Sequence, residues 1–482
     1  MANIENIKIP YPTEGVIRSA QLSDTVCPEN SVQLAINFHF DRIGSMTQRL
    51  GVATYATTLG GSVTAFGTLN IQGGAKRLFA QVGTAIHSWN GSTWTSVRSG
   101  LNTDKARFSQ FLNRTWMVNG NDNDDVETSN GGAFDTTDVP ATFPKGDFIQ
   151  AGFDGRVWVA DSSNDILYYT DIVQSLDGTS YEPLTFSLTE NFIAKFSPQN
   201  GESITGLFRV PKALLLFKEN HIYRVYGISN VDPYPAYNVG TFSQESIVQA
   251  KDGIYFHHSS GFYKFTYDAQ PTEISRRISD VVKAIPRSAY PNIIGVYDGA
   301  DAVKWSLGPL TFEGVTYKNM QVRYTLSTQV WTIYDFPDLS ITALIRYDNG
   351  TTIEQIVGTS TGLVGKLDSG YKDFTKSIYY EMIDRWRSFT DMYSHSKKMG
   401  GVAVMNENGG GALLQYQTDK EQVNKWHDIG PLRSNYACLF PNNTSKDFNM
   451  IRFRIKGDAT GTPIVINGIE ILSLSDEGYD EN

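Results

Sequence analysis

The segment Gly358-Thr-Ser-Thr-Gly362 has the residue pattern of a nucleophile elbow, a strained turn that exposes a serine for attack on an ester or amide. That device needs a strand before the serine and a helix after it. The residues that follow, Leu363 to Leu367, instead predict a second strand. The sequence therefore favours a hairpin turn over a catalytic serine.

A run of acidic and amide side chains, Asn121-Asp-Asn-Asp-Asp125 followed by Glu127, offers clustered oxygen atoms of the kind that bind calcium. The run lacks the glycine and the ligand spacing of a helix–loop–helix calcium site. Acidic runs are usually solvated loops. We therefore expect a surface loop, and whether Asn121 to Asp125 bind a cation stays open.

Two adjacent histidines, His257 and His258, stand in an apolar run that predicts a strand. Successive side chains of a strand point to opposite faces, so these two rings cannot ligate one metal ion together. We interpret both as packing residues of a sheet. The sequence predicts no metal-binding residue and no cofactor.

The segment Ser88-Trp-Asn-Gly-Ser-Thr-Trp94 resembles the turn repeat of sialidase propellers. It lacks the aspartate of that repeat and occurs once. A glycosidase would also need a carboxylate pair or a tyrosine nucleophile, and the sequence does not indicate where either would lie. We predict that the protein is not an enzyme and name no catalytic residue.

The composition favours strands joined by tight turns, since the 482 residues include 43 Gly, 25 Tyr, 26 Phe and 8 Trp. With 41 Lys and Arg against 51 Asp and Glu, the formal net charge is −10. This charge disfavours a protein that coats nucleic acid through phosphate contacts. Cys27 and Cys438 are too few for a disulfide scaffold or a thiolate zinc site.

The N-terminal residues, Met1 to Pro10, contain neither a basic segment nor an apolar core and do not resemble a signal peptide. No apolar run in the sequence approaches the roughly 20 residues of a transmembrane helix. We expect a protein made in the cytoplasm, for which a role at a cell surface would require release by lysis.

Short apolar and aromatic runs recur roughly every 8 to 15 residues between turn-forming clusters, as in antiparallel sheets. Strong examples are Ile222-Tyr-Arg-Val-Tyr226, Gly261-Phe-Tyr-Lys-Phe265 and Gln329-Val-Trp-Thr-Ile333. Units of two such strands repeat at roughly 40 to 60 residues, near the period of propeller blades. The pattern predicts an all-β fold and is compatible with a β-propeller of roughly six to eight blades or with a pair of β-sandwiches, and the family resemblance given below favours the propeller.

Two flanking regions lack the blade pattern. We predict an N-terminal extended arm over residues 1–65, the β-propeller over 66–375, and a C-terminal β-sandwich with an acidic tail over 376–482. In the last region Ile451, Phe453 and Ile455 alternate with Arg452 and Arg454, which is typical of a half-buried strand.

Four scattered segments carry a resemblance to a known family. They are Ala35 to Gly44 leading to Arg49-Leu-Gly51, Glu202 to Gly227, Asp252 to Ile278, and Ile451 to Ile471. The first combines an asparagine within a strand, a glycine turn and an Arg-x-Gly sequence. Together these segments resemble the nozzle proteins of short-tailed phages, also called tail hub or packaged-DNA stabilisation proteins.

The resemblance implies a propeller protein that assembles with itself into a cyclic ring, usually a hexamer, below the portal and tail adaptor proteins. Tail fibre or spike proteins would be further partners. The ring would retain the packaged DNA and serve as the ejection channel, through which DNA passes without sequence-specific binding. We therefore expect a structural protein of the virion, located in the phage tail and assembled in the host cytoplasm.

The negative net charge of the chain is consistent with such a channel. Six copies would carry a formal charge of 6 × −10 = −60, and an acidic wall would let DNA slide without sticking. Two other functions stay open. Aromatic side chains could line a sugar-binding groove of a tail-tip receptor- or glycan-binding propeller, although packing between blades is the favoured interpretation. A polysaccharide hydrolase is the second alternative.

Overall fold

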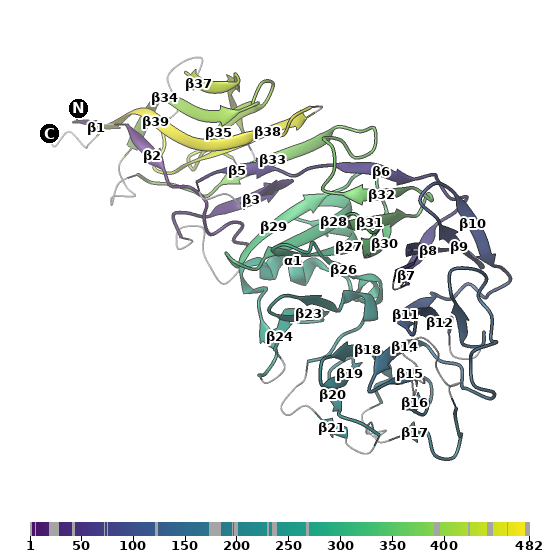
Figure 1. Cartoon of the computed structure of the whole chain (residues 1–482). Helices are drawn as coiled ribbons and strands as arrows, with labels where there is room; N and C mark the ends of the chain where they lie inside the picture. The colour runs from purple at the N-terminus through teal and green to yellow at the C-terminus, as the bar shows by residue number, and fades with distance from the viewer. Residues whose placement is uncertain are drawn as a thin grey trace.

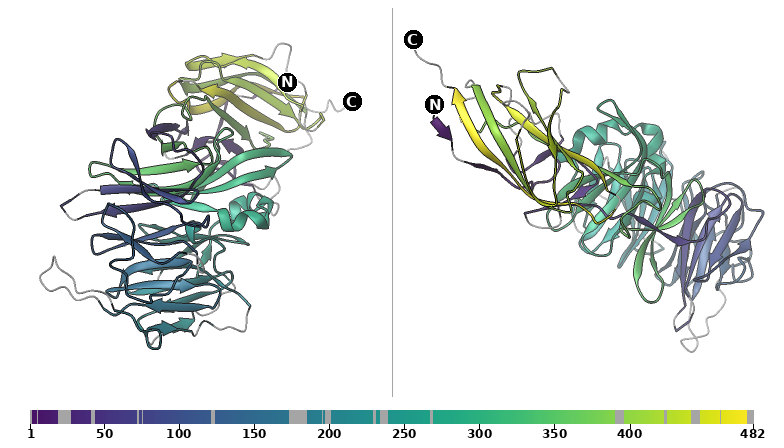
Figure 2. Two further views of the ribbon diagram at one scale, coloured as in Figure 1. Left: turned by 90° about the vertical axis from the view of Figure 1, so that its right-hand side faces the viewer. Right: turned by 90° about the horizontal axis from the view of Figure 1, so that it is seen from above.

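The computed structural model describes residues 2–4, 6–18, 28–40, 44–71, 73–74, 76–120, 124–172, 185–194, 196, 201–228, 231–233, 239–266, 269–389, 396–422, 425–440, 447–459 and 461–477. The fold is all-β, and one short α-helix, α1 (Ser279–Ala284), occurs among these residues. A β-propeller occupies one end of an elongated molecule and a β-sandwich the other, with both termini at the sandwich end (Figures 1 and 2).

Within the described residues, six separate sheets and the first four strands of a nine-stranded sheet form seven propeller blades. The first blade comprises β7 (Val63–Asn70), β8 (Lys76–Val82), β9 (Ala85–Trp89) and β10 (Trp94–Arg98), and the second comprises β11 (Arg107–Phe111), β12 (Arg114–Val118) and β13 (Glu127–Ser129). The third comprises β14 (Phe148–Phe153), β15 (Arg156–Asp161), β16 (Ile166–Tyr169) and β17 (Phe192–Ile193). The fourth comprises β18 (Ile204–Val210), β19 (Ala213–Lys218), β20 (Ile222–Val225) and β21 (Val231–Pro233).

The fifth blade comprises β22 (Val248–Ala250), β23 (Gly253–His258), β24 (Gly261–Phe265) and β25 (Thr272–Glu273). The sixth comprises β26 (Ile294–Tyr297), β27 (Ala302–Phe312), β28 (Val315–Thr325) and β29 (Val330–Asp335). The seventh comprises β30 (Ile341–Asp348), β31 (Ile353–Thr359) and β32 (Val364–Leu367) with the N-terminal strand β6 (Val52–Ala56). The innermost strands follow one another around the axis, and β30 of the last blade lies beside β7 of the first. The seven blades agree with the predicted six to eight.

Apolar side chains fill the spaces between blades, as a radial array requires. Trp116 of the second blade packs in the cluster that contains Val157 of the third, and Trp158 of the third packs in the cluster that contains Leu216 of the fourth. Both tryptophans are almost completely buried. The interpretation of the aromatic residues as packing between blades therefore holds for these two.

The boundary at residue 65 differs from the structure, because β6 completes the last blade. It pairs antiparallel with β32, with Val52 opposite Leu367. A sheet edge leaves backbone groups unpaired unless another strand covers it, and here a strand from before the first blade covers the edge of the last. The described part of residues 1–65 thus includes a propeller strand and is not a separate arm.

Two sheets form the sandwich, and N-terminal strands enter both. One sheet runs β37 (Asn435–Leu439), β34 (Ser396–Glu407), β39 (Val465–Glu477), β5 (Met46–Gln48), β4 (Phe38–His39), with β1 (Ala2–Ile4) and β2 (Ile7–Ile9) also paired to β39. The other continues the sixth blade: after β29 come β3 (Val32–Ile36), β33 (Ile378–Asp384), β38 (Ile451–Ala459), β35 (Leu413–Thr418) and β36 (His427–Pro431). The propeller and the sandwich therefore share one sheet.

Polar side chains join the two parts at the same place. The Asn37 side chain donates to the Tyr379 carbonyl of the sandwich at 2.7 Å and accepts from the Asp335 backbone N–H of the sixth blade at 2.8 Å. It also accepts from Arg49 Nε at 2.7 Å. Asn37 has a φ of 61°, a left-handed conformation that asparagine tolerates better than most residues. The first segment of the family resemblance thus lies at the junction.

Candidate functional site

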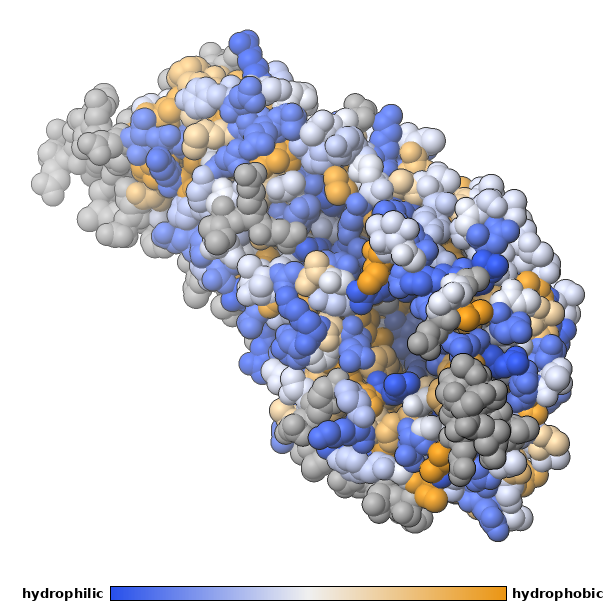
Figure 3. Space-filling model, in the orientation of Figure 1, coloured by the Kyte–Doolittle hydropathy of each residue, from blue (hydrophilic) through white to orange (hydrophobic). Residues whose placement is uncertain are grey.

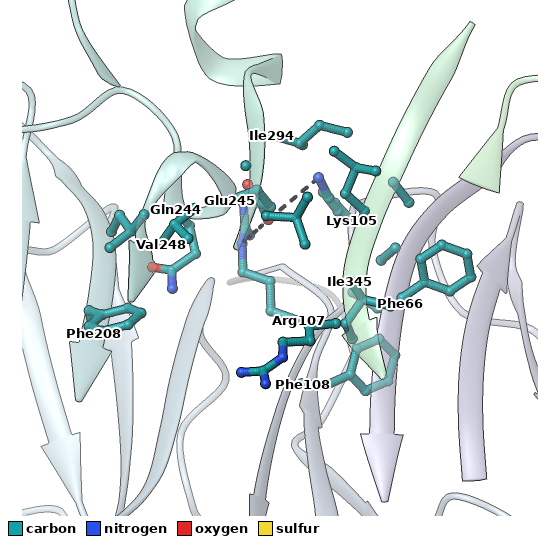
Figure 4. A pocket seen from close by; sticks show the side chains of 18 of the residues that line it. Phe66, Lys105, Arg107, Phe108, Phe208, Gln244, Glu245, Val248, Ile294 and Ile345 are labelled. Atoms are coloured by element: carbon teal, nitrogen blue, oxygen red, sulfur yellow. Dashed lines mark hydrogen bonds and ion pairs between the residues drawn. The ribbon is translucent and has the colours of Figure 1, made fainter. Parts of the chain in front are cut away.

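A cavity of about 400 Å³ lies on the propeller axis, and the inner edges of all seven blades line it. Figure 3 shows the surface hollowed in the middle of the propeller face, and Figure 4 shows the side chains that line this axial channel. A volume of this size suits a small ligand. It does not suit double-stranded DNA, whose major groove alone is about 12 Å wide.

An ionic cluster crosses the channel. Glu245 Oε1 lies 3.1 Å from Arg107 Nε and 3.5 Å from Lys105 Nζ (Figure 4). Lys105 and Arg107 are at the start of the second blade, whereas Glu245 is in the 3₁₀ turn η2 (Gln244–Ser246) before the fifth. Because these blades are not neighbours, the cluster ties opposite sides of the ring together.

Further contacts hold Arg107 in place. Its Nη1 donates to the Asp147 carbonyl at 2.9 Å, and its guanidinium carbon lies 4.4 Å from the ring centroid of Phe148. Arg107 therefore contacts the third blade as well as the fifth. A positively charged planar group held by a carboxylate, a carbonyl and an aromatic ring has little freedom to reorient.

The protein interior changes the acidity of this cluster. Burial raises the pKa of Glu245, but the positive charges of Lys105 and Arg107 outweigh this effect. The pKa is lowered from 4.5 to about 2. Burial lowers the pKa of Lys105. The side chains of Lys105 and Glu245 keep 27% and 20% of their surface exposed to the channel. The arrangement is a structural ionic bridge and also a polar constriction of the channel.

Gln244 closes a gap between two blades. Its side-chain oxygen accepts from the Leu207 N–H at 2.5 Å, and its side-chain nitrogen donates to the Leu207 carbonyl at 2.7 Å. The side-chain amide therefore satisfies both backbone groups of Leu207, as a neighbouring strand would. A Cβ at Gly206 would lie 2.7 Å from the Gln244 side-chain oxygen, so a larger residue there would displace this amide.

The nucleophile-elbow motif lies in a hairpin, as predicted. Ser360 occupies the turn between β31 and β32, and both flanking elements are strands. The Thr359 hydroxyl accepts from the Leu363 N–H at 3.0 Å, and the Ser360 N–H donates to the Ser340 carbonyl at 2.9 Å. These contacts stabilise a turn and do not present a nucleophile.

The acidic run is only partly described, because residues 121–123 lie outside the described residues. Asp124 accepts from the Asn102 N–H at 2.9 Å, and Glu127 is buried and accepts from Arg98 Nε at 2.8 Å. Burial raises the pKa of Glu127 although Arg98 opposes the effect. Asp124 and Glu127 therefore already have protein partners.

The two adjacent histidines lie in β23 and contact different partners. The His257 ring packs 5.1 Å from the rings of Phe262 and Tyr290, and neither of its nitrogens has a hydrogen-bond partner among the described residues. His258 bonds to the Ser260 hydroxyl at 2.8 Å and to the Asn220 side-chain oxygen at 3.1 Å. Burial lowers the pKa of His257 to about 3 and that of His258 to about 4.

The tryptophan-containing turn joins β9 to β10. The Asn90 side-chain oxygen accepts from the N–H groups of Ser92 and Thr93, both at 2.9 Å. The rings of Trp89 and Trp94 lie 5.2 Å apart. This segment forms a tight turn with an aromatic pair at its base.

Two kinds of feature are absent from the described part of the chain. No three His, Cys, Asp or Glu side chains there lie close enough together to hold a metal ion. No helix there is long and apolar enough to cross a membrane.

The sequence did not indicate the channel cluster. Lys105 and Glu245 are 140 positions apart, and only the closed ring brings them together. The single local signal is a pair of basic residues two positions apart at the start of a strand, which places both on one face.

No family model matches the chain, and no curated protein matches it. Among solved structures, YCF48 from Cyanidioschyzon merolae is similar over 66% of this chain and 98% of its own, with 11% identity and a TM-score of 0.41. The WD40 propeller domain of Doa1 is similar over 66% and 96%, with 11% identity and a TM-score of 0.37. The order of the strands and sheets shows by itself that the chain is an all-β protein built on a β-propeller.

Proposed function

We propose that the chain is a structural subunit of a phage tail, a nozzle or hub protein that assembles as a ring below the portal and adaptor. The ring retains the packaged DNA and forms the channel through which it leaves. The proposal assigns no catalytic residue and no cofactor. It rests on the family resemblance of four segments together with the way the propeller is joined to the sandwich.

The rigid junction is the observation that carries the proposal. The sixth blade and the sandwich share one continuous sheet, in which β29 pairs with β3 at Ile333 and Ile36. N-terminal strands are part of both the propeller and the sandwich. A subunit that resists the pressure of packaged DNA must not hinge between its domains, and a shared sheet with a buried polar junction opposes such hinging.

The path of DNA in this proposal runs between copies and not through a propeller. The axial channel is small and is crossed by the Glu245 cluster. A repeated head-to-tail contact closes subunits into a ring with a wider opening. The surplus of acidic residues would face that opening, where it repels phosphates. A map of an assembled ring with a basic lumen would contradict this part.

An exposed apolar patch on the sandwich is suited to a neighbouring subunit or tail protein. Strand β37 is an edge of its sheet among the described residues, and Tyr436 lies directly opposite Met405. Tyr436 and Phe440 keep 54% and 61% of their surface exposed. Exposed apolar side chains beside an open sheet edge favour association with another chain.

Mass photometry and negative-stain images of the purified chain, alone and with the portal and adaptor proteins of its phage, test the proposal. We expect closed rings, and we expect the double variant Tyr436→Ser/Phe440→Ser to form fewer of them. Ile353→Ser is the matched control, because Ile353 is equally exposed on the last blade, at 54%. Monomers under every condition would contradict the proposal.

A further inference from the structure

We propose that the open face of the sandwich binds a neutral oligosaccharide, in a groove between this face and the tip of the β27–β28 hairpin. The groove has a volume of about 1010 Å³, and ligand pockets typically have roughly 300–1,000 Å³. Strands β3, β33, β35 and β38 line it, and the hairpin tip contributes Phe312, Val315 and Tyr317. We call it the sandwich groove. The inference is independent of ring assembly.

Two tryptophans and two arginines alternate in the sandwich groove. The guanidinium carbon of Arg452 lies 4.5 Å from the ring centroid of Trp386 and 5.2 Å from that of Trp426. That of Arg454 lies 4.4 Å from the centroid of Trp426. Both tryptophan residues remain partly exposed. The stack holds the rings in place before a ligand arrives, so a sugar ring can lie against them at a small entropic cost.

Hydrogen bonds orient the polar groups of the sandwich groove. Arg452 donates from Nε and Nη2 to the Gln417 side-chain oxygen, at 3.0 and 2.7 Å. Arg454 donates from Nε to the Gln415 oxygen at 2.6 Å and from Nη1 to Glu381 Oε1 at 3.4 Å. These planar groups offer fixed donors and acceptors side by side. Adjacent hydroxyls of a sugar, each both donor and acceptor, match such a surface.

One carboxylate oxygen on the wall lacks a hydrogen-bond partner among the described residues. Asp335 lines the sandwich groove, and its Oδ1 is buried without a hydrogen-bond partner among the described residues. Burial raises the pKa of this carboxyl to about 6, although Arg49 opposes the effect. A buried acceptor without a donor costs free energy, which a ligand hydroxyl would recover.

The charges of the sandwich groove select the class of ligand. Arg18, Arg452 and Arg454 stand against five acidic lining residues, Glu313, Asp335, Glu381, Asp419 and Glu421, which gives 3 − 5 = −2. A net negative surface opposes nucleic acids and phosphorylated or carboxylated ligands. Aromatic rings together with polar planar groups suit a ligand with apolar faces and many hydroxyls. A neutral oligosaccharide of a few units combines these properties.

A glycan array tests the inference with the full chain as the reagent. The array carries neutral and acidic oligosaccharides of two to six units, and the strongest neutral probe is then titrated against intrinsic tryptophan fluorescence. We expect saturable binding to neutral glycans. Trp426→Ala should weaken this binding about tenfold or more, as loss of a central aromatic contact does. Glu381→Gln, which preserves shape, should weaken it about tenfold as well.

Trp94→Phe in the first blade is the matched control and should leave the affinity unchanged, because Trp94 is far from the sandwich groove in the chain and lies in another sheet. Circular dichroism confirms that each variant is folded. Binding to acidic glycans alone, no binding at millimolar probe, or an affinity that neither Trp426→Ala nor Glu381→Gln changes would overturn the inference. Self-association of the chain that Trp426→Ala abolishes would also overturn it, since the groove would then hold a second copy.

Discussion

Arg49 and Asp373, 324 residues apart in the chain, form a two-point ion pair inside the protein, with nitrogen–oxygen distances of 2.8 and 2.6 Å. Only 2% of the Arg49 side chain and 5% of the Asp373 side chain are exposed. Arg49 also donates to the Asn37 side chain and to the Asp335 carbonyl. One guanidinium thus links the N-terminal segment, the sixth blade and the segment after the last blade.

Loss of this ion pair should destabilise the protein strongly. Asp373→Asn leaves the buried charge of Arg49 without its counter-charge, and we expect a loss of about 3–5 kcal/mol in the free energy of unfolding. Urea denaturation followed by tryptophan fluorescence measures it. Asp138→Asn is the control, because its pair with Arg114 lies at the surface and should change stability by less than about 1 kcal/mol. Equal effects of the two substitutions would contradict the role assigned to Arg49.

Gly51 should not tolerate a methyl group. A Cβ at this position would lie 2.0 Å from the Lys372 carbonyl oxygen, whereas at Gly60 no atom lies within 4 Å. We expect Gly51→Ala to lower the thermal midpoint markedly, by a loss of about 1–3 kcal/mol as in other overpacked sites. Gly60→Ala should be neutral or slightly stabilising. Differential scanning calorimetry of the two variants checks this, and similar midpoints would refute the close approach of β6 to the segment after the last blade.

The buried histidine His257 should make stability depend on pH. In the unfolded chain histidine titrates near 6.5, but burial lowers the pKa of His257 to about 3. Between these values the unfolded state binds the additional proton. The stability of the folded protein is therefore not reduced by His257 above pH 6.5. Below that pH, protonation of His257 in the unfolded state lowers the free energy of unfolding by about 1.4 kcal/mol per pH unit.

His257→Phe keeps an aromatic ring against Phe262 and Tyr290 and removes the titration. Urea midpoints between pH 4 and 8 should fall less steeply for this variant than for the unchanged protein. Titration of the carboxylates affects the stability of both proteins equally, so its effect cancels in this comparison. Parallel curves would show that His257 does not remain neutral in the folded state.

The channel cluster should contribute to stability through charge. Glu245→Gln keeps the shape of the side chain but leaves Lys105 and Arg107 without a carboxylate, and we expect a loss of about 1–2 kcal/mol near neutral pH. Because the pKa of Glu245 is lowered from 4.5 to about 2, the stabilisation is present above pH 4.5 and disappears as the pH falls toward 2.

Urea denaturation at several pH values tests the channel cluster, with Arg276→Gln as the control that removes a highly exposed charge. The two stability curves of the parent and Glu245→Gln should converge at acidic pH. A difference that persisted unchanged down to pH 2 would contradict the ionic role of Glu245.

Local patterns of the sequence predicted the strands well, because alternation and turn residues act over a few positions. The run Gly261 to Phe265 coincides with β24, and Ile222 to Tyr226 differs from β20 by one residue. The alternation around Arg452 correctly indicated a half-buried strand. These features depend on neighbours in the chain.

Contacts between distant segments were beyond such patterns. The pairing of β6 with β32 follows from closure of the ring, and no local sequence pattern predicts that closure. Trp386 and Trp426 meet Arg452 only because three strand-linked segments converge on one face. Asn37 and Arg49 lay in a segment already singled out by resemblance, yet their partners across the junction became visible only in the fold.

A cryo-EM map of the tail of the intact virion tests the central claim most directly. We predict copies of the propeller and the sandwich, fitted together as one rigid body, arranged in a closed ring around the DNA path below the portal and adaptor, with acidic side chains toward the lumen. A map in which the chain is absent from that ring, or occurs only at the tip of a fibre, would contradict the account.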